Sequence, residues 1–306
     1  MASFANSFFR TAQGKNAEAI ENHTMLQAFE WGTEGGGRHW NKLRDLAPTL
    51  SQMGITALWI PPPTKAAGSE SVGYDTYDLW DLGEFTPDRD QQTGRRTKYG
   101  NREELESMMS ACRDHGIAIY FDAVLNHKMG SDRDPQTFKV VEVAQDDRQK
   151  VISGEPFDIK GYTKFDFPQR NGQYSKFQWA FEHFTGVDYD ADSGRSAIYK
   201  IVGDQKDWAK GVDQEHGNYD FLMGADVAHA HPSVSEDLMN WGDWTLRTFP
   251  LSGFRFDAVK HISREFISNF VKHVRKVAHE SRQSKGESQP DSAEDGPHVF
   301  AVGEFW

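Results

Sequence analysis

The chain alternates between short apolar runs and longer segments in which apolar residues recur every three or four positions. The short runs are typical of buried strands and the periodic segments of amphipathic helices. Expected strands lie at 24–31, 55–63, 117–124, 251–259 and 298–305, and expected helices lie at 39–54, 102–116, 233–249 and 263–280. Strand and helix patterns that alternate in this way favour right-handed βαβ units and a parallel sheet.

The alternation is interrupted in the middle of the chain. Residues 128–224 are polar, rich in glycine and β-leaning, with their clearest strand at 195–203. We therefore expect an α/β protein with an incomplete (β/α)8 TIM barrel of about five strands out of eight. Residues 1–127 are expected to form the first part of the barrel, 128–224 an inserted β-rich subdomain after strand three, and 225–306 a truncated continuation of the barrel.

Residues 281–297 form a charged, low-complexity segment between the last expected helix and the last expected strand. Such a composition predicts a disordered loop. In a β/α barrel, a loop that joins a helix to the following strand lies on the bottom face, away from the active site.

Charge and cysteine content narrow the choice of partner and compartment. The formal net charge of −12 argues against nucleic acid or an anionic membrane as the main partner. A single cysteine, Cys112, excludes an intramolecular disulfide and suits a reducing compartment. No apolar run approaches the length of a membrane span, and the first 20 residues lack the apolar core of a secretory signal. We expect a cytoplasmic monomer.

Aromatic residues make up 13% of the chain, and many lie in polar surroundings such as 176–190 and 239–246. Aromatic faces among carboxylates and amides suit a sugar-binding cleft. Ordinary core aromatics would also explain much of this content.

Polar residues follow the expected strands at their carboxyl ends, where α/β enzymes place their sites. The period-2 alternation of a strand puts Arg255 and Asp257 on one face and Phe254 and Phe256 on the other. Because an adjacent cation favours a carboxylate, we expect Arg255 to keep Asp257 ionised.

The last expected strand carries Glu304, followed by Phe305 and Trp306. Apolar surroundings favour the protonated acid, so Glu304 is expected to act as a proton donor. A retaining glycosidase needs two carboxyl groups about 5 to 5.5 Å apart. The spacing of neighbouring strands, about 4.8 Å, can supply that separation for Asp257 and Glu304.

Several longer motifs carry a family resemblance. The segments "DAVLNH", "GFRFDAVKH" and "GEFW" resemble the first three signature regions of the α-amylases of glycoside hydrolase family 13. The segments "LQAFEW", "VGYDTYDLWDLGEF" and "GNYDFLMGADV" are similar to its liquefying, intracellular-type subgroup. The resemblance runs from residue 24 to 306. It implies retaining endohydrolysis of α-1,4-glucosidic bonds in an α-glucan such as starch, glycogen or maltodextrin.

The resemblance also implies roles for individual residues. Asp257 matches the nucleophile, Glu304 the general acid/base, and Arg255 the partner of the nucleophile. The positions that match substrate-binding residues are Tyr77, which would stack on the sugar, His127, which would hydrogen-bond to it, Lys260 and His261, on the leaving-group side, and Trp306, which would line the cleft.

The family binds calcium between the barrel and the inserted subdomain, and the resemblance implies one structural Ca²⁺ here. Its matching ligands are Asn126, Asp220, Asp226 and the backbone carbonyl of His261. These oxygen donors are the type that calcium prefers. The subgroup usually carries two further acids that build an additional metal cluster, where this chain has Ala228 and Ala230. Asp190 and Asp207 could contribute, but we expect the extra cluster not to form.

The fourth signature region of the family, with its third catalytic carboxylate, is absent, as are strands six to eight. One alternative is therefore a catalytically inactive truncated fragment that retains glucan or calcium binding. Another is a related enzyme that transfers the glycosyl group to a second sugar.

Overall fold

A parallel sheet of five strands forms the centre of the protein. The computed structural model describes residues 23–85, 95–204, 206–284 and 299–306. The strands of this sheet pair in the order β1-β2-β5-β12-β13. They are β1 (Met25–Gln27), β2 (Ala57–Trp59), β5 (Ala118–Ala123), β12 (Gly253–Phe256) and β13 (Phe300–Gly303). Spatial order follows chain order, which confirms the predicted incomplete (β/α)8 barrel.

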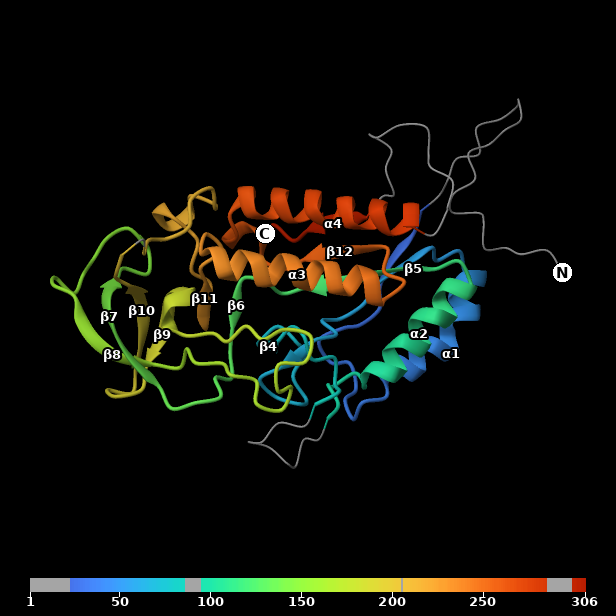
Figure 1. The fold of residues 1–306 in the computed structure, drawn as a ribbon, viewed down its shortest axis with the longest axis horizontal. Helices are drawn as coiled ribbons and strands as arrows, with labels where there is room; N and C mark the ends of the chain where they lie inside the picture. The colour runs from blue at the N-terminus through green and yellow to red at the C-terminus, as the bar shows by residue number, and fades with distance from the viewer. Residues whose placement is uncertain (1–22, 86–94, 205, 285–298) are drawn as a thin grey trace, which may run out of the picture.

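Four helices cover this sheet, and they pack in two pairs (Figure 1). They are α1 (His39–Gln52), α2 (Arg102–Asp114), α3 (Pro232–Thr248) and α4 (Arg264–Ser284). A capping box starts α2, because the Asn101 side chain accepts from the Glu104 N–H and Glu104 accepts from the Asn101 N–H. Proline at the first position starts α3. None of the helices in the described ranges is long and apolar enough to span a membrane.

The expected disordered loop at 281–297 is wrong in its first residues. Helix α4 continues to Ser284, four residues beyond the predicted end at 280. A charged, low-complexity composition does not by itself exclude a helix. The rest of the expected loop, residues 285–297, lies outside the described residues.

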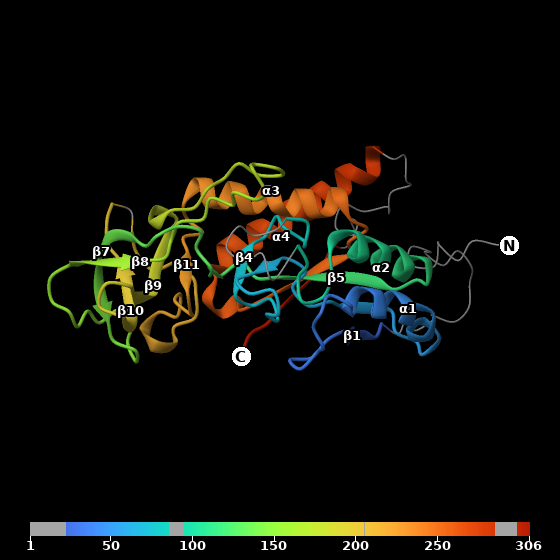
Figure 2. The same cartoon turned by 90° about the horizontal axis from the view of Figure 1, so that it is seen from below.

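A second, antiparallel sheet lies between β5 and β12 in the chain. Its strands pair in the order β6-β11-β9-β10-β7-β8. They are β6 (His127–Lys128), β7 (Gln136–Val143), β8 (Phe157–Gly161), β9 (Phe184–Asp190), β10 (Arg195–Ile201) and β11 (Ala225–Val227). The sheet thus begins one residue before the expected start of the inserted subdomain at 128, and it ends three residues after the expected end at 224. Figure 2 shows it at one end of the elongated molecule.

Shorter elements complete the fold. A two-stranded hairpin of β3 (Lys65–Ala66) and β4 (Thr76–Asp78) lies between β2 and α2. Short 3-10 helices in the described part of the chain include Phe181–His183, Glu215–Gly217 and Val259–His261.

Large apolar side chains fill the space between the parallel sheet and its helices. Phe254 and Phe256 of β12 pack against Phe270 of α4, and Phe254 also contacts Trp241 of α3. All four are at most 1% exposed. Arg255 lies on the opposite face, as the strand alternation predicts. Cys112 of α2 is fully buried, and burial raises the pKa of its thiol to about 12.

Candidate active site

Three carboxylates meet at one guanidinium at the carboxyl end of the parallel sheet. Arg255 of β12 contacts Asp122 of β5 at 2.6 Å, Asp257 at 2.8 Å and Glu304 at 2.7 Å. Strand register explains the meeting, because Arg255 pairs directly with Asp122, and Gly303, just before Glu304, pairs with Phe256. The structure therefore brings Asp257, Glu304 and Arg255 together and places Asp122, at the carboxyl end of β5, in contact with the same guanidinium.

The electrostatics of Asp257 differ from the prediction. Its side chain is buried, and burial together with the charge of Asp122 raises the pKa of Asp257 to about 7, although Arg255 acts in the opposite direction. Burial likewise raises the pKa of Asp122 to about 6. Arg255 lowers the pKa of Asp257 as expected, but it does not hold this acid fully ionised, because the one cation is shared by three acids.

The surroundings of Glu304 also differ from the expected apolar pocket. Its side chain is 37% exposed and pairs with Arg255. The aromatic residues that follow are turned to solvent, with Phe305 61% and Trp306 57% exposed. Proximity in the sequence to aromatic residues did not produce burial, because Glu304 lies beyond the end of β13.

Aromatic residues that were not predicted surround the carboxylates. Trp59 Nε1 and the Tyr74 hydroxyl each donate to Asp122 Oδ2 at 2.9 Å. The Arg255 guanidinium lies over both rings, 4.7 Å from the Trp59 centroid and 5.7 Å from that of Tyr74. The indole of Trp31 stacks on Tyr74 at 6.1 Å with an interplanar angle of 3°, and it is 74% exposed. A flat aromatic surface thus lies beside the acids.

Tyr77 is not brought to this cluster. It is 7% exposed, and its hydroxyl donates to Asp132 at 2.5 Å. Its ring packs against Phe165 and Phe167. The tyrosine in contact with the acids is Tyr74, three positions earlier in the same "GYDTYD" segment.

His127 is placed next to this tyrosine by β6. Its Nε2 lies 2.7 Å from the Tyr74 carbonyl oxygen, and the residue is 1% exposed. Burial lowers the pKa of His127, so the ring is neutral around pH 7. In this structure His127 fixes the backbone of Tyr74.

Two predicted residues, Lys260 and His261, lie in the 3-10 turn after β12 and contact the predicted Trp306. Lys260 Nζ donates to the Trp306 carbonyl at 2.9 Å and forms an ion pair with Glu215. The His261 ring lies 5.5 Å from that of Trp306, and its Nδ1 is 2.6 Å from the Tyr219 carbonyl. Lys260, His261 and Trp306 therefore lie in contact, with Lys260 and His261 buried and Trp306 exposed. Their role in holding the glucan stays a prediction.

The predicted calcium ligands converge between the two sheets. Asn126, Asp220 and Asp226 are at most 1% exposed, and the Oδ1 atom of each lacks a hydrogen-bond partner among the described residues. Val227 N donates to the Asn126 carbonyl, which holds Asn126 beside Asp226. The charge of Asp220 adds to burial in raising the pKa of Asp226.

Unpaired buried carboxylates are costly unless a cation compensates them, so this donor set fits a hard cation such as calcium. We refer to Asn126, Asp220 and Asp226 as the oxygen cradle. It holds only two acids, and the described ranges contain no cluster of three or more His, Cys, Asp or Glu side chains arranged for a metal.

The two acids considered for an additional metal cluster have other partners. Asp190 accepts from the Lys160 N–H at 3.0 Å and from the Ser193 hydroxyl at 2.5 Å, in the turn between β9 and β10. Asp207 pairs with Lys200 at 2.6 Å.

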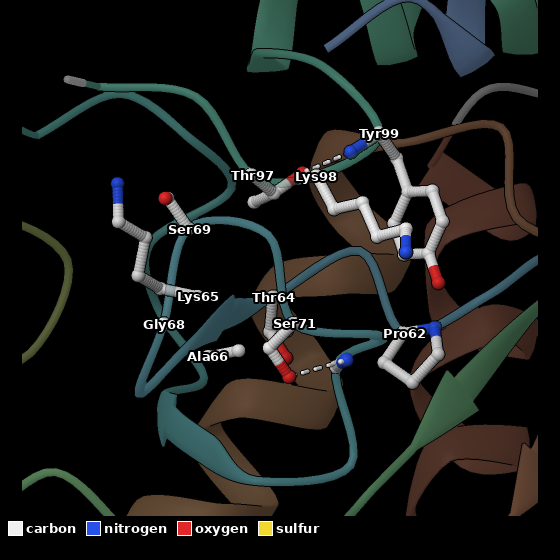
Figure 3. A pocket seen from close by; sticks show the side chains of 11 residues that line it. Pro62, Thr64, Lys65, Ala66, Gly68, Ser69, Ser71, Thr97, Lys98 and Tyr99 are labelled. Carbon is white, nitrogen blue, oxygen red and sulfur yellow. Dashed lines mark hydrogen bonds between the residues drawn. The ribbon is translucent and has the colours of Figure 1, made fainter. Parts of the chain in front are cut away.

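A small cavity lies beside the β3–β4 hairpin (Figure 3). It is lined by residues of two segments, 62–73 and 97–99, and its volume is about 10 Å³. Since that volume is close to the minimum for one water molecule, the cavity is too small for a sugar ring.

Comparison with known proteins agrees with this geometry. The sequence model of the family "Alpha amylase, catalytic domain" matches residues 40–302. A glucan 1,4-alpha-maltohexaosidase of Bacillus sp. (strain 707) is 43% identical over 93% of this chain and 51% of its own length. An alpha-amylase of Bacillus licheniformis is 41% identical over 95% of this chain and 52% of its own. A cytoplasmic alpha-amylase of Escherichia coli (strain K12) is 40% identical over 85% and 52%.

The chain spans about half the length of the curated relatives that it matches. The family match covers most of the chain, including β2, β5, β12 and nearly all of β13. By this match and by the identities above, the chain belongs to the α-amylase family.

Proposed function

We propose that the protein is an α-amylase-type hydrolase that cleaves internal α-1,4-glucosidic bonds of starch, glycogen or maltodextrins with retention of configuration. The observation that carries the proposal is the position of Asp257 and Glu304 at the carboxyl ends of adjacent strands, both paired with Arg255. Two carboxyl groups on neighbouring strands suit the separation of about 5 to 5.5 Å that the retaining reaction needs.

In the proposed reaction Asp257 attacks the anomeric carbon while the bond from that carbon to the glycosidic oxygen breaks. Glu304 gives its proton to the departing oxygen. Glu304 then removes a proton from water, whose oxygen attacks the anomeric carbon and releases Asp257. Arg255 holds both carboxyl groups in place, and Asp257 must lose its own proton before it can attack.

We propose that the aromatic surface of Trp31 and Tyr74 binds the sugar beside these acids. Tyr74, rather than Tyr77, has the position for stacking, because its ring lies over Arg255. Lys260, His261 and Trp306 would form the leaving-group side of the site, since Lys260 and His261 support the exposed Trp306 from beneath.

We further propose that the oxygen cradle binds one Ca²⁺. Carboxylate and amide oxygens of the cradle, with the backbone carbonyl of His261, would hold the ion. When bound, calcium supplies positive charge that balances the buried acids and joins the antiparallel sheet to the barrel strands. We also propose that the protein is cytoplasmic, which its single, unpaired cysteine supports, and monomeric.

Release of reducing sugar from soluble starch by the 306-residue chain tests the proposed function. Glu304→Gln and Asp257→Asn should each lower kcat by about 10²-fold or more, because each removes a reacting group. The exposed pair Glu265→Gln and Asp192→Asn serves as the matched control and should leave kcat unchanged.

Two other results would replace the proposal. A chain that binds maltohexaose without releasing reducing sugar would fit the inactive fragment. A chain that lengthens maltohexaose instead of hydrolysing it would fit a transferring enzyme.

A further inference from the structure

A hollow of about 480 Å³ opens between α3 and the loop that crosses it, and it shares no residue with the carboxylate cluster. Sites for small molecules commonly fall between about 300 and 1,000 Å³. The lining residues come from three segments and are Trp80, Tyr174, Ser175, Lys176, Phe177, Ser233, Glu236, Asp237 and Asn240.

One wall of the hollow is a polar face of α3. Ser233, Glu236, Asp237 and Asn240 are spaced at i, i+3, i+4 and i+7, so they lie along one side of the helix. Ser233, Glu236 and Asn240 are exposed and present a hydroxyl, a carboxylate and an amide. These groups can donate and accept hydrogen bonds with a polyhydroxylated ligand.

The other wall is aromatic. The rings of Tyr174 and Phe177 are half-buried, and both are held by neighbours. Tyr174 lies 5.0 Å from the Trp244 ring and donates its hydroxyl proton to Glu84 at 2.9 Å. Phe177 meets Trp179 edge-on at 5.1 Å. These rings therefore offer fixed apolar surface opposite the polar face of α3.

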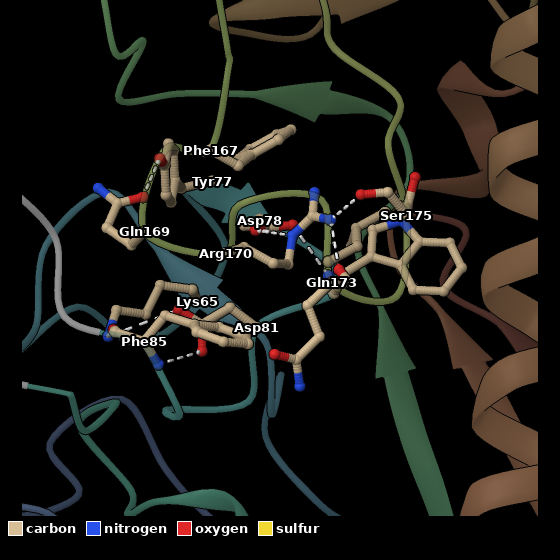
Figure 4. A network of polar contacts seen from close by, with 12 residues as sticks. Lys65, Tyr77, Asp78, Asp81, Phe85, Phe167, Gln169, Arg170, Gln173 and Ser175 are labelled. Carbon is tan, nitrogen blue, oxygen red and sulfur yellow. Dashed lines mark hydrogen bonds and ion pairs between the residues drawn. The ribbon is translucent and has the colours of Figure 1, made fainter.

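Buried polar contacts of Arg170 hold the loop that carries these rings. Arg170 forms a buried ion pair with Asp78 of β4 at 2.8 Å and donates to the carbonyls of Gln173, at 2.7 Å, and of Ser175 (Figure 4). The Ser175 hydroxyl donates to Asp237 at 2.6 Å, which ties the loop to α3. The hollow is thus formed before any ligand arrives.

The backbone of this loop is strained. Asn171 and Tyr174 have φ angles of 48° and 67°, in the left-handed region that a bulky residue such as tyrosine rarely adopts. Strain of this kind persists where the surrounding structure imposes it, and it gathers at binding sites.

We propose that this hollow binds a short α-1,4-glucan segment at a second site, separate from the reacting acids. Fixed aromatic faces opposite hydroxyl, amide and carboxylate groups suit a neutral sugar. The lining holds two acids, Glu236 and Asp237, and one cation, Lys176. This excess of acids disfavours a phosphate or another anion. The choice of glucan rests on the proposed function, and the site would hold a polymer on the surface while another part of it is cleaved.

Hydrogen-exchange footprinting of the Asp257→Asn chain with and without maltohexaose tests the site. We expect slower amide exchange at 174–177 and 233–240 when maltohexaose is added. In Glu236→Ala/Asn240→Ala that protection should be lost, with binding there weakened about tenfold or more, since two hydrogen-bonding side chains are removed. Glu265→Ala/Asn269→Ala, at exposed positions of α4 outside the hollow, is the matched control and should keep the protection.

No change in exchange at 174–177 and 233–240, or protection that survives Glu236→Ala/Asn240→Ala, would overturn the inference. The footprint of the chain with both residues intact decides the question even if the double variant folds poorly. If the unsubstituted chain hydrolyses starch but the Asp257→Asn chain shows no protection at the hollow, the proposed function stands and the second site is removed. If the hollow is protected but the unsubstituted chain does not hydrolyse starch, the second site stands and the proposed function is removed.

Discussion

At the scale of single residues, Arg255 contacts three carboxylates and can balance the charge of only one. The two buried acids, Asp122 and Asp257, respond with raised pKa values. An excess of negative charge suits a reaction whose transition state gains positive charge on the sugar. The same excess makes protonation of Asp257 the step that limits activity at low pH.

The pH profile of hydrolysis should therefore depend on Asp122. Asp257 attacks as a carboxylate, so kcat/KM should fall as the pH drops through its pKa, about 7 in the free protein. Asp122→Asn removes a negative neighbour that raises this pKa, and the acidic limb of the profile should move to lower pH. Measurement of kcat/KM on a chromogenic maltooligosaccharide from pH 4.5 to 9 checks the shift.

Asp45→Asn, at an exposed position of α1, is the control and should leave the limb in place. An acidic limb that stays fixed in Asp122→Asn, or moves to higher pH, would show that Asp122 does not set the protonation of Asp257.

Residue reasoning from the sequence found Asp257, Glu304 and Arg255 because strand alternation and position at strand ends are local signals. It left out Asp122 as a partner, because Asp122 and Arg255 are 133 positions apart and meet only through the pairing of β5 with β12. The family resemblance pointed to Tyr77, and Tyr74 of the same short motif was not considered, because only the path of the hairpin decides which ring reaches the acids.

At the scale of elements, the loop from 167 to 177 depends on one buried ion pair. The side chains of Arg170 and Asp78 are 2% and 3% exposed. Removal of one partner from such a pair leaves an uncompensated buried charge. The same guanidinium also donates to two carbonyls of the loop, so its loss would leave these backbone groups without that hydrogen-bond donor.

Arg170→Ala should lower the free energy of unfolding by about 3–5 kcal/mol, mainly because Asp78 is left buried without a cation. Arg113→Ala is the matched control, since its ion pair with Asp114 is mostly exposed and should contribute about 1 kcal/mol or less. Urea denaturation of the three proteins measures the difference. Equal losses for the two variants would contradict a structural role of the buried pair.

Helices and barrel strands were predictable because each has a periodic apolar face that the parallel sheet buries. The antiparallel sheet was predictable only as a β-rich region. Its two shortest strands, β6 and β11, have two and three residues, too few for a period to be read. They form because β11 pairs with the longer strand β9 and β6 pairs with β11.

At the scale of the whole molecule, the oxygen cradle lies where the two sheets meet. Asn126 follows β5 of the barrel, and Asp226 lies in β11 of the antiparallel sheet. A cation bound there would favour the folded chain over the unfolded one, and the two sheets would be stabilised together.

Calcium should therefore raise the Tm of the chain, with a gain of about 2.7 kcal/mol at a concentration of 100 times Kd. Asp220→Asn/Asp226→Asn should lose this response, while the exposed Asp192→Asn should keep it. Differential scanning calorimetry with calcium, magnesium or a chelator checks the result. Magnesium should have less effect, because it requires a smaller octahedral site. A calcium response that persists in the double variant would place the ion elsewhere.

The order of strands in the parallel sheet has a consequence for how the chain is made. Since β1, β2, β5, β12 and β13 pair in chain order, each new strand meets an edge that has already left the ribosome. All six strands of the antiparallel sheet are translated between β5 and β12, so that sheet can form before β12 is made. Translation at about 5–20 residues per second leaves time for each addition. Vectorial synthesis would then build the barrel strand by strand and bring Glu304 to Arg255 only after every other group of the cluster is in place.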